Sequence, residues 1–192
     1  FFNIEILKTN YVKTVPVEID IIGGPSYGYK VSGIDLDPVS IKINGSINEL
    51  QNINSVNLNS INIDGRTSSL LTNVPLPLSD SYTYIDITDI KIAITIVPIY
   101  GSIRTTAIPQ IVGNEDKKLE FDENFRYIEL TLRGPLDIIS KLQSFDLKSE
   151  IDISSLEVGE QTVRPKILLP DNIALVSSEP SEIIVQIYEL TE

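Results

Sequence analysis

The chain has 192 residues, of which 42% are hydrophobic and 22% charged, a composition typical of a folded globular protein. Its net charge of −12 repels phosphate backbones and anionic lipid, which argues against nucleic acid as a partner. Cysteine and histidine are absent, which excludes a disulfide framework, a thiolate nucleophile, an imidazole base and a zinc–thiolate site.

The sequence carries no membrane-spanning segment of its own, because no apolar run approaches the ~20 residues that a spanning helix needs. It has no signal peptide and no initiator Met, so we expect it to be a segment of a longer protein. A membrane anchor upstream in that protein is compatible with these residues.

Alternating apolar residues predict β-strands along most of the chain. Residues 1–7 (FFNIEIL) resemble the later segments ITIVPIY (94–100) and IVQIYEL (184–190). Residues 1–9 are therefore interpreted as the last strand of a preceding repeat, or as a linker. Single strands are predicted for residues 15–21 (VPVEIDI) and 90–96 (IKIAITI), and further strands for residues 163–169 and 183–187.

Two stretches, residues 39–58 and 128–147, carry the same apolar pattern 89 residues apart. One glycine also coincides, Gly45 with Gly134, whereas most of the polar residues differ. Each stretch is predicted to contain a strand, a helix of about two turns and the start of the next strand. The coinciding apolar pairs are Val39/Ile128, Ile41/Leu130, Ile43/Leu132, Ile47/Leu136, Leu50/Ile139, Ile53/Leu142, Val56/Phe145 and Leu58/Leu147.

These patterns predict a mainly β protein with two small, irregular β-domains in tandem, each with one short helix packed on its sheet. The two repeats are placed at residues 10–98 and 99–192. Gly45 and Gly134 are expected at a corner where the chain leaves its strand with a positive φ. The residues expected to be buried between strand and helix are Ile41, Ile43, Leu50, Ile53, Leu130, Leu132, Ile139 and Leu142.

Candidate chemical groups are few. Asp35 and Asp37 lie on one face of an extended segment, as glycosidase or metal carboxylates do, but Asn124 and Arg126 stand at these positions in the second repeat. We therefore interpret both aspartates as part of a solvated edge. The acidic stretch 114–124 (NEDKKLEFDEN) lacks the ligand spacing of a calcium loop and is interpreted as a charged loop.

Other motifs also have structural explanations. GGPSYG (23–28) lacks the lysine of a phosphate-binding loop and is predicted to be a turn. Asn44-Gly45-Ser46 matches a glycosylation sequon, and a turn asparagine explains it more simply. Five of the eight tyrosines are scattered singly, mostly at loop or strand ends: Tyr27, Tyr29, Tyr82, Tyr84 and Tyr100. We therefore predict no catalytic, cofactor-binding or metal-binding residue, and no enzymatic activity.

Both repeats resemble the YbbR-like domain. The resemblance rests on PVSIKINGSINELQNINSVNLNSINIDG (38–65), IELTLRGPLDIISKLQSFDLKSEIDISSLEVGEQTV (128–163) and the closing strand EPSEIIVQIYEL (179–190). The first copy has Gly45-Ser46 where the family has Gly-Pro, and the second has Tyr127 where the family has a proline. The resemblance implies an irregular β-fold, like the C-terminal domain of ribosomal protein L25, and no known catalytic residue.

The same resemblance implies a bacterial protein with an N-terminal membrane helix and several tandem domains outside the cytoplasm. Better-understood members regulate a membrane-bound diadenylate cyclase, which makes cyclic di-AMP. The first functional hypothesis is therefore a non-catalytic, extracytoplasmic interaction module whose partner is a protein at the bacterial membrane, with that cyclase as the candidate and no cofactor. The alternative is a carbohydrate-binding or adhesin-type β-module of the cell envelope, although the chain has no Trp and only 7% aromatic residues.

Overall fold

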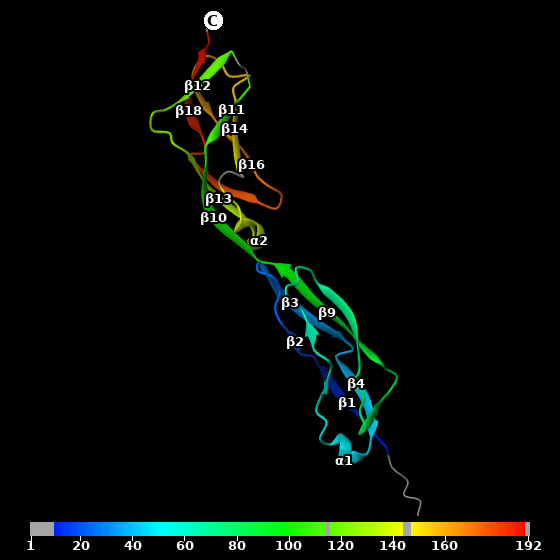
Figure 1. The fold of residues 1–192 in the computed structure, drawn as a ribbon. Coiled ribbons are helices and arrows are strands. Elements are labelled where there is room, and N and C mark those ends of the chain that lie inside the picture. Colours follow the sequence, from blue (N-terminus) through cyan, green and yellow to red (C-terminus); the bar gives the residue numbers. More distant parts are fainter. Residues whose placement is uncertain (1–9, 114–115, 144–146, 191–192) are drawn as a thin grey trace, which may run out of the picture. The chain divides into compact units, whose positions relative to one another are not determined.

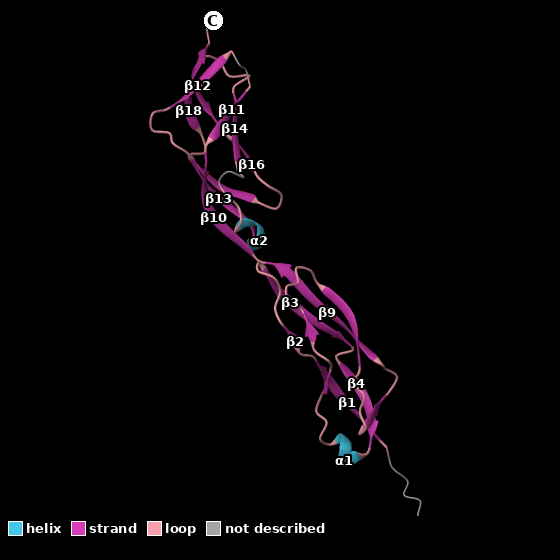
Figure 2. Cartoon of the chain, in the orientation of Figure 1, coloured by secondary structure: helices cyan, strands magenta, loops and turns pink. Residues whose placement is uncertain are grey.

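The structure, a computed structural model, describes residues 10–113, 116–143 and 147–190. The strand predicted at residues 1–9 lies outside them. The chain divides into two compact units, unit 1 (Phe1–Pro98) and unit 2 (Ile99–Glu192). Strands dominate both, and each has one four-residue helix among its described residues, which confirms the predicted fold class (Figure 2).

Unit 1 is built from three sheets with the strand orders β5-β1-β4-β8, β2-β6 and β3-β9-β7 (Figure 1). β1 and β4 are antiparallel, whereas β5 runs parallel to β1 and β6 runs parallel to β2. Its elements are β1 (Tyr11–Glu18), β2 (Ile21–Ile22), β3 (Tyr29–Asp37), β4 (Ser40–Gly45), α1 (Ile47–Leu50), β5 (Val56–Asn57), β6 (Ile61–Asn62), β7 (Leu70–Pro75), β8 (Tyr82–Tyr84) and β9 (Asp89–Pro98).

Unit 2 repeats this plan with the sheets β10-β13-β17, β11-β14-β16 and β12-β18-β15. The antiparallel pair β10–β13 corresponds to β1–β4, and the parallel pair β11–β14 corresponds to β2–β6. Its elements are β10 (Tyr100–Ala107), β11 (Pro109–Val112), β12 (Lys117–Phe121), β13 (Ile128–Pro135), α2 (Leu136–Ile139), β14 (Lys148–Asp152), β15 (Gly159–Val163), β16 (Lys166–Leu168), β17 (Ala174–Glu179) and β18 (Ile183–Glu189).

Each unit has its own hydrophobic core, and the repeated apolar pattern supplies much of it. Six of the eight residues expected to be buried are at most 3% exposed: Ile41, Ile43, Leu50, Leu130, Leu132 and Ile139. The prediction is wrong for Ile53 and Leu142, which are only partly buried because they follow the last residue of their helix. Val39 precedes β4 and is 66% exposed, and Phe145 lies outside the described residues.

Two segments predicted as single strands are broken. Residues 15–21 form the end of β1 and the start of β2, because the chain turns from pairing with β4 to parallel pairing with β5 and then β6. Residues 163–169 contain the end of β15 and all of β16, with Arg164-Pro165 between them. Since β15 pairs with β18 and β16 with β14, the break moves the chain from one sheet to another.

The two aligned glycines are required by close packing, and the predicted positive φ is wrong at both. A Cβ at Gly45 would lie 2.9 Å from the Ser81 carbonyl oxygen and 3.2 Å from Leu50 Cδ2. A Cβ at Gly134 would lie 2.5 Å from Ile173 Cδ1. Each glycine stands two residues before its helix begins, so the correspondence between the two copies holds.

Candidate functional site

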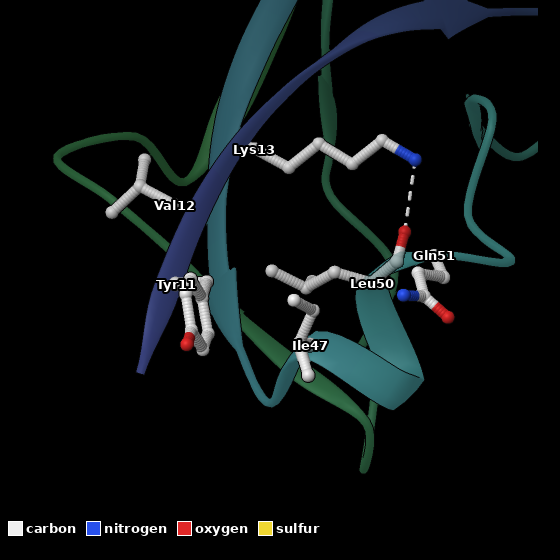
Figure 3. Close-up of a pocket in the computed structure, with 6 residues that line it drawn as sticks. All are labelled: Tyr11, Val12, Lys13, Ile47, Leu50 and Gln51. Carbon is white, nitrogen blue, oxygen red and sulfur yellow. Dashed lines mark hydrogen bonds between the residues drawn. The ribbon is translucent and has the colours of Figure 1, made fainter. Parts of the chain in front are cut away.

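An apolar groove lies between α1 and the start of β1 (Figure 3). Its volume is about 300 Å³, and we call it the α1 groove. The side chains of Tyr11, Ile47 and Leu50 point toward one another across it. Ile47 and Tyr11 are each 45% exposed, whereas Leu50 is buried and reaches the core. The residues that line the α1 groove are Tyr11, Val12, Lys13, Ile47, Leu50 and Gln51.

Hydrogen bonds at both ends hold the one-turn helix beside the groove. At its N-terminus, the Ser46 N–H donates to Glu49 Oε2 at 3.2 Å, as in a capping box. At its C-terminus, Lys13 Nζ donates to the carbonyl oxygens of Leu50 at 2.9 Å and Ile53 at 2.6 Å. A cation is favourable there because the last carbonyls of a helix have no intrahelical partner. Lys13 therefore fixes the wall of the groove.

The equivalent place in unit 2 is filled by the protein itself. Strand pairing makes Gly101 the counterpart of Tyr11 and Ile103 the counterpart of Lys13. Leu136 lies directly over Gly101, where a Cβ would be 3.1 Å from Leu136 Cδ2. Leu136 and Ile103 both pack against the core of unit 2. The α1 groove is thus a difference between two copies of one fold.

A second, polar hollow of about 540 Å³ lies on the other side of α1. Beside it, the Tyr84 hydroxyl donates to the Pro77 carbonyl oxygen at 2.6 Å, and its ring meets the Tyr82 ring edge-on at 5.5 Å. Burial raises the pKa of Tyr84, and the neighbouring Tyr82 adds to the effect, so the phenol stays protonated as a donor. The hollow is lined by Asn10, Asn44, Gly45, Ser46, Glu49, Ser79, Asp80, Ser81, Tyr82 and Thr83.

The acidic residues considered from the sequence do not converge. Asp35 and Asp37 are exposed on β3, opposite Ala93 and Lys91 of β9. The interpretation of residues 114–124 as a loop is wrong in part, because Lys117–Phe121 forms β12. In that strand Lys118 Nζ contacts Glu120 Oε1 at 2.7 Å. Within the described residues, no three His, Cys, Asp or Glu side chains are placed to hold a metal ion.

The remaining motifs lie apart from one another. GGPSYG forms a loop that Ser26 ties down through its N–H to the Arg66 carbonyl oxygen at 3.0 Å. Asn44 lies within β4, so its interpretation as a turn residue is wrong. Tyr27 is 69% exposed on the loop, whereas Tyr82 and Tyr84 pack against the core. Tyr29 also packs against that core, whereas Tyr100 is 55% exposed in unit 2. Of the four candidate tyrosines in unit 1, three are therefore packed on the core and do not form a row of exposed rings.

The α1 groove was not predicted, although its signal is present in the sequence. The apolar residues that build the strand and helix coincide in the two repeats, but the start of the first strand does not. Tyr11 and Lys13 stand where the second repeat has Gly101 and Ile103, an offset of 90 residues. Comparing the repeats at that offset would have marked these two positions.

Within the part of the chain that is described, neither helix is long or apolar enough to cross a membrane.

The model of the YbbR-like protein family matches residues 15–96 and 105–187, which is most of the chain. The chain therefore belongs to the YbbR-like family, as two tandem domains. It is also similar to the CdaA regulatory protein CdaR of Bacillus subtilis (strain 168), at 25% identity over 177 residues. That match covers 88% of this chain and 36% of the relative, so the chain spans about a third of the relative's length.

Solved structures of the family show similarity to one or both units. The YbbR-like domain of the lmo2119 protein from Listeria monocytogenes aligns at 17% identity and a TM-score of 0.41, covering 48% of this chain and 97% of that one. A YbbR-like protein from Streptococcus pneumoniae TIGR4 aligns at 16% identity and a TM-score of 0.31, covering 96% and 98%.

Proposed function

We propose that the chain is a non-catalytic interaction module that regulates a membrane diadenylate cyclase through protein contacts. The observation that carries the proposal is the similarity to CdaR, which is named as a regulatory protein of CdaA and aligns along 88% of this chain. The two repeats, residues 10–98 and 99–192, would lie at the extracytoplasmic face of a bacterial membrane. Further residues of the parent protein would supply the membrane anchor.

The chemistry of the described residues supports a role through contact. The chain has no His or Cys, and among the described residues no three Asp or Glu side chains are placed to hold a metal ion. The exposed surfaces available to a protein partner are the outer strands of the sheets, such as β3 and β7, and the α1 groove. Outer strands offer unpaired backbone groups, which a partner's strand can meet by hydrogen bonding.

The experiment is to delete residues 10–190 from the parent protein, keep its anchor, and measure cyclic di-AMP in cells. A matched control replaces these residues with an unrelated β-module of similar length, which preserves a spacer and removes the contacts. We expect the deletion and the replacement to change the cyclic di-AMP level alike. An unchanged level in both would refute the proposal, and restoration by the unrelated module would reduce the role to that of a spacer.

The non-enzymatic part of the proposal has its own test. The purified fragment is assayed for turnover of candidate nucleotides and glycans, together with a variant in which Asp35 and Asp37 are both changed to Asn. We expect no turnover by either protein. Turnover that the double substitution abolishes would overturn the assignment, whereas the cyclic di-AMP experiment would be unaffected by it.

A further inference from the structure

The sheet β12-β18-β15 of unit 2 buries one face and exposes the other. Along its middle strand, β18, Ile183, Val185 and Ile187 are at most 3% exposed and belong to the core. Ile184 and Tyr188 point to the opposite face, where they are 54% and 43% exposed. The exposed face therefore presents apolar area to water along β18.

Carboxylates flank this apolar area on both sides. Gln186 of β18 lies opposite Glu120 of β12 and opposite Glu160 of β15. Neighbouring strands are about 5 Å apart, so the two glutamates stand on either side of β18 and about 10 Å from each other. A hollow of about 250 Å³ lies on this face, and four of its lining residues are acidic whereas none is basic. We call its lining the acidic face: Glu120, Phe121, Asp122, Glu123, Glu160, Ile184, Val185, Gln186 and Tyr188.

Most of this negative charge is not neutralised within the unit. The Lys118 ammonium, 2.7 Å from Glu120 Oε1, lowers the pKa of Glu120, so this carboxylate stays ionised. Among the described residues, Glu123 and Glu160 form no ion pair. The carboxylates of the described chain also include no group of three that could hold one metal ion. Their separation on the acidic face matches several separate positive charges better than a single cation.

The corresponding face of unit 1 has different chemistry. When β9 is aligned with β18 through their buried residues, Ala93 stands in place of Ile184. Gly33, which lies opposite Thr95 of β9, stands in place of Glu120. Because the same fold forms with either set of residues, the fold does not require the apolar and acidic side chains of the acidic face.

We propose that the acidic face binds an extended, basic segment of a partner protein. An apolar side chain of the segment packs on Ile184, and lysine or arginine side chains beside it pair with Glu120 on one side and Glu160 on the other. The long Lys and Arg side chains can span the ~5 Å from β18 to either neighbouring strand. The Tyr188 ring offers a further contact to a cation. An apolar centre with a charged rim is a common composition of protein interfaces.

The charge of the acidic face selects this occupant. Nucleic acid, anionic lipid and a second copy of the same face all bring negative charge, which the four carboxylates repel. Complementary charge also gives specificity and speeds association. The inference rests on the proposed role as an interaction module but not on the identity of the cyclase. The binding experiment below can fail while the cyclic di-AMP experiment succeeds, so the two failures are distinguishable.

The test uses a synthetic peptide with the sequence Gly-Lys-Val-Lys-Val-Lys-Gly. The peptide is titrated into the whole isotope-labelled chain, and the backbone amide shifts are followed by NMR. We expect saturable shifts confined to β12, β15 and β18, and several-fold weaker binding at high salt. The control peptide Gly-Glu-Val-Glu-Val-Glu-Gly should not bind. Shifts spread equally over both units, or equal binding of the acidic peptide, would overturn the proposal.

Matched charge substitutions test the carboxylates. E120Q/E160Q should weaken binding of the lysine peptide several-fold. The control is D35N/D37N, which removes the same charge from the corresponding sheet of unit 1 and should leave binding unchanged. Equal weakening by the two double variants would refute a defined site, because it would show attraction by net charge alone.

A second pair of variants tests the apolar contact. I184S should weaken binding several-fold, whereas L71S, which removes a side chain that is 64% exposed on β7 of unit 1, should not. The peptide Gly-Lys-Ser-Lys-Ser-Lys-Gly, which keeps the charge and lacks the valines, should bind the unmodified chain more weakly. Equal affinities for the valine and serine peptides would contradict the apolar contact. Binding of calcium ions at these amides without binding of the lysine peptide would overturn the proposal in favour of a metal ion.

Discussion

Truncating one equivalent core residue in each unit should destabilise the two units by different amounts. Leu50 and Ile139 occupy corresponding positions on α1 and α2 and are 3% and 2% exposed. Changing either residue to Ala removes three buried hydrocarbon groups, and losing the burial of each lowers the free energy of unfolding by about 0.8 kcal/mol. A sealed cavity on the order of 80 Å³ adds about 2 kcal/mol at ~24 cal/mol per Å³.

The two sites differ in whether that cavity is sealed. Leu50 lines the α1 groove, so its truncation enlarges a space that is already open, and the cavity contribution is largely absent. We expect Leu50→Ala to cost about 2 to 3 kcal/mol and Ile139→Ala about 4 kcal/mol. Val12→Ala, at a position 61% exposed, is the control and should leave the stability nearly unchanged.

The assay is urea denaturation followed by hydrogen exchange and mass spectrometry, because a chain with two units need not unfold in one step. Peptides from unit 1 report the first variant, and peptides from unit 2 report the second. Equal costs at the two positions would refute the assignment of an open site beside Leu50 and a closed one beside Ile139. A cost near zero for either would show that the helix is not packed on its sheet.

Three further changes test other parts of the structure. Gly45→Ala should lower the free energy of unfolding by about 1 to 3 kcal/mol, because the new Cβ would lie 2.9 Å from the Ser81 carbonyl oxygen. Gly24→Ala is the control and should be neutral, because a Cβ there has no atom within 4 Å. Equal thermal stabilities of the two variants would contradict the close approach. Ser149→Ala should leave the free energy of unfolding unchanged or raise it by about 1 kcal/mol, because the buried hydroxyl has no hydrogen-bond partner among the described residues, and a clear loss in denaturant midpoint would count against this. Hydrogen bonds from the Ser154 side chain and backbone lower the pKa of Asp152 in the folded protein. The stability that this ionised carboxylate contributes is therefore present above its unfolded pKa and is lost as the pH falls through the lowered, folded pKa. Asp152→Asn should weaken the loss of stability of unit 2 in acid, and an unchanged acid dependence in a pH titration of stability would refute this role.

The sequence alone determined the class of fold and most of the core. Apolar residues at every second position are typical of a strand with one buried face, and the strand predicted at residues 90–96 lies within β9, where Ile90, Ile92 and Ile94 are at most 1% exposed. The repeated frame around Gly45 and Gly134 also showed that one small fold is used twice. This information is local or periodic, and it needs no knowledge of which strands become neighbours.

The tertiary structure decided the features that depend on contacts between distant segments. The strand predicted at residues 15–21 breaks because Val17 pairs with β5 and Ile21 with β6, each some forty residues away in the chain. The α1 groove lies between Tyr11 and a helix that is more than thirty residues away in the chain, so the residues around Tyr11 do not predict it. In unit 2, Gly101 stands in place of Tyr11 and lets Leu136 close the same place. Alternation fixes which face of a strand is apolar, but the shape of the surface is set by the side chains that packing brings against that face.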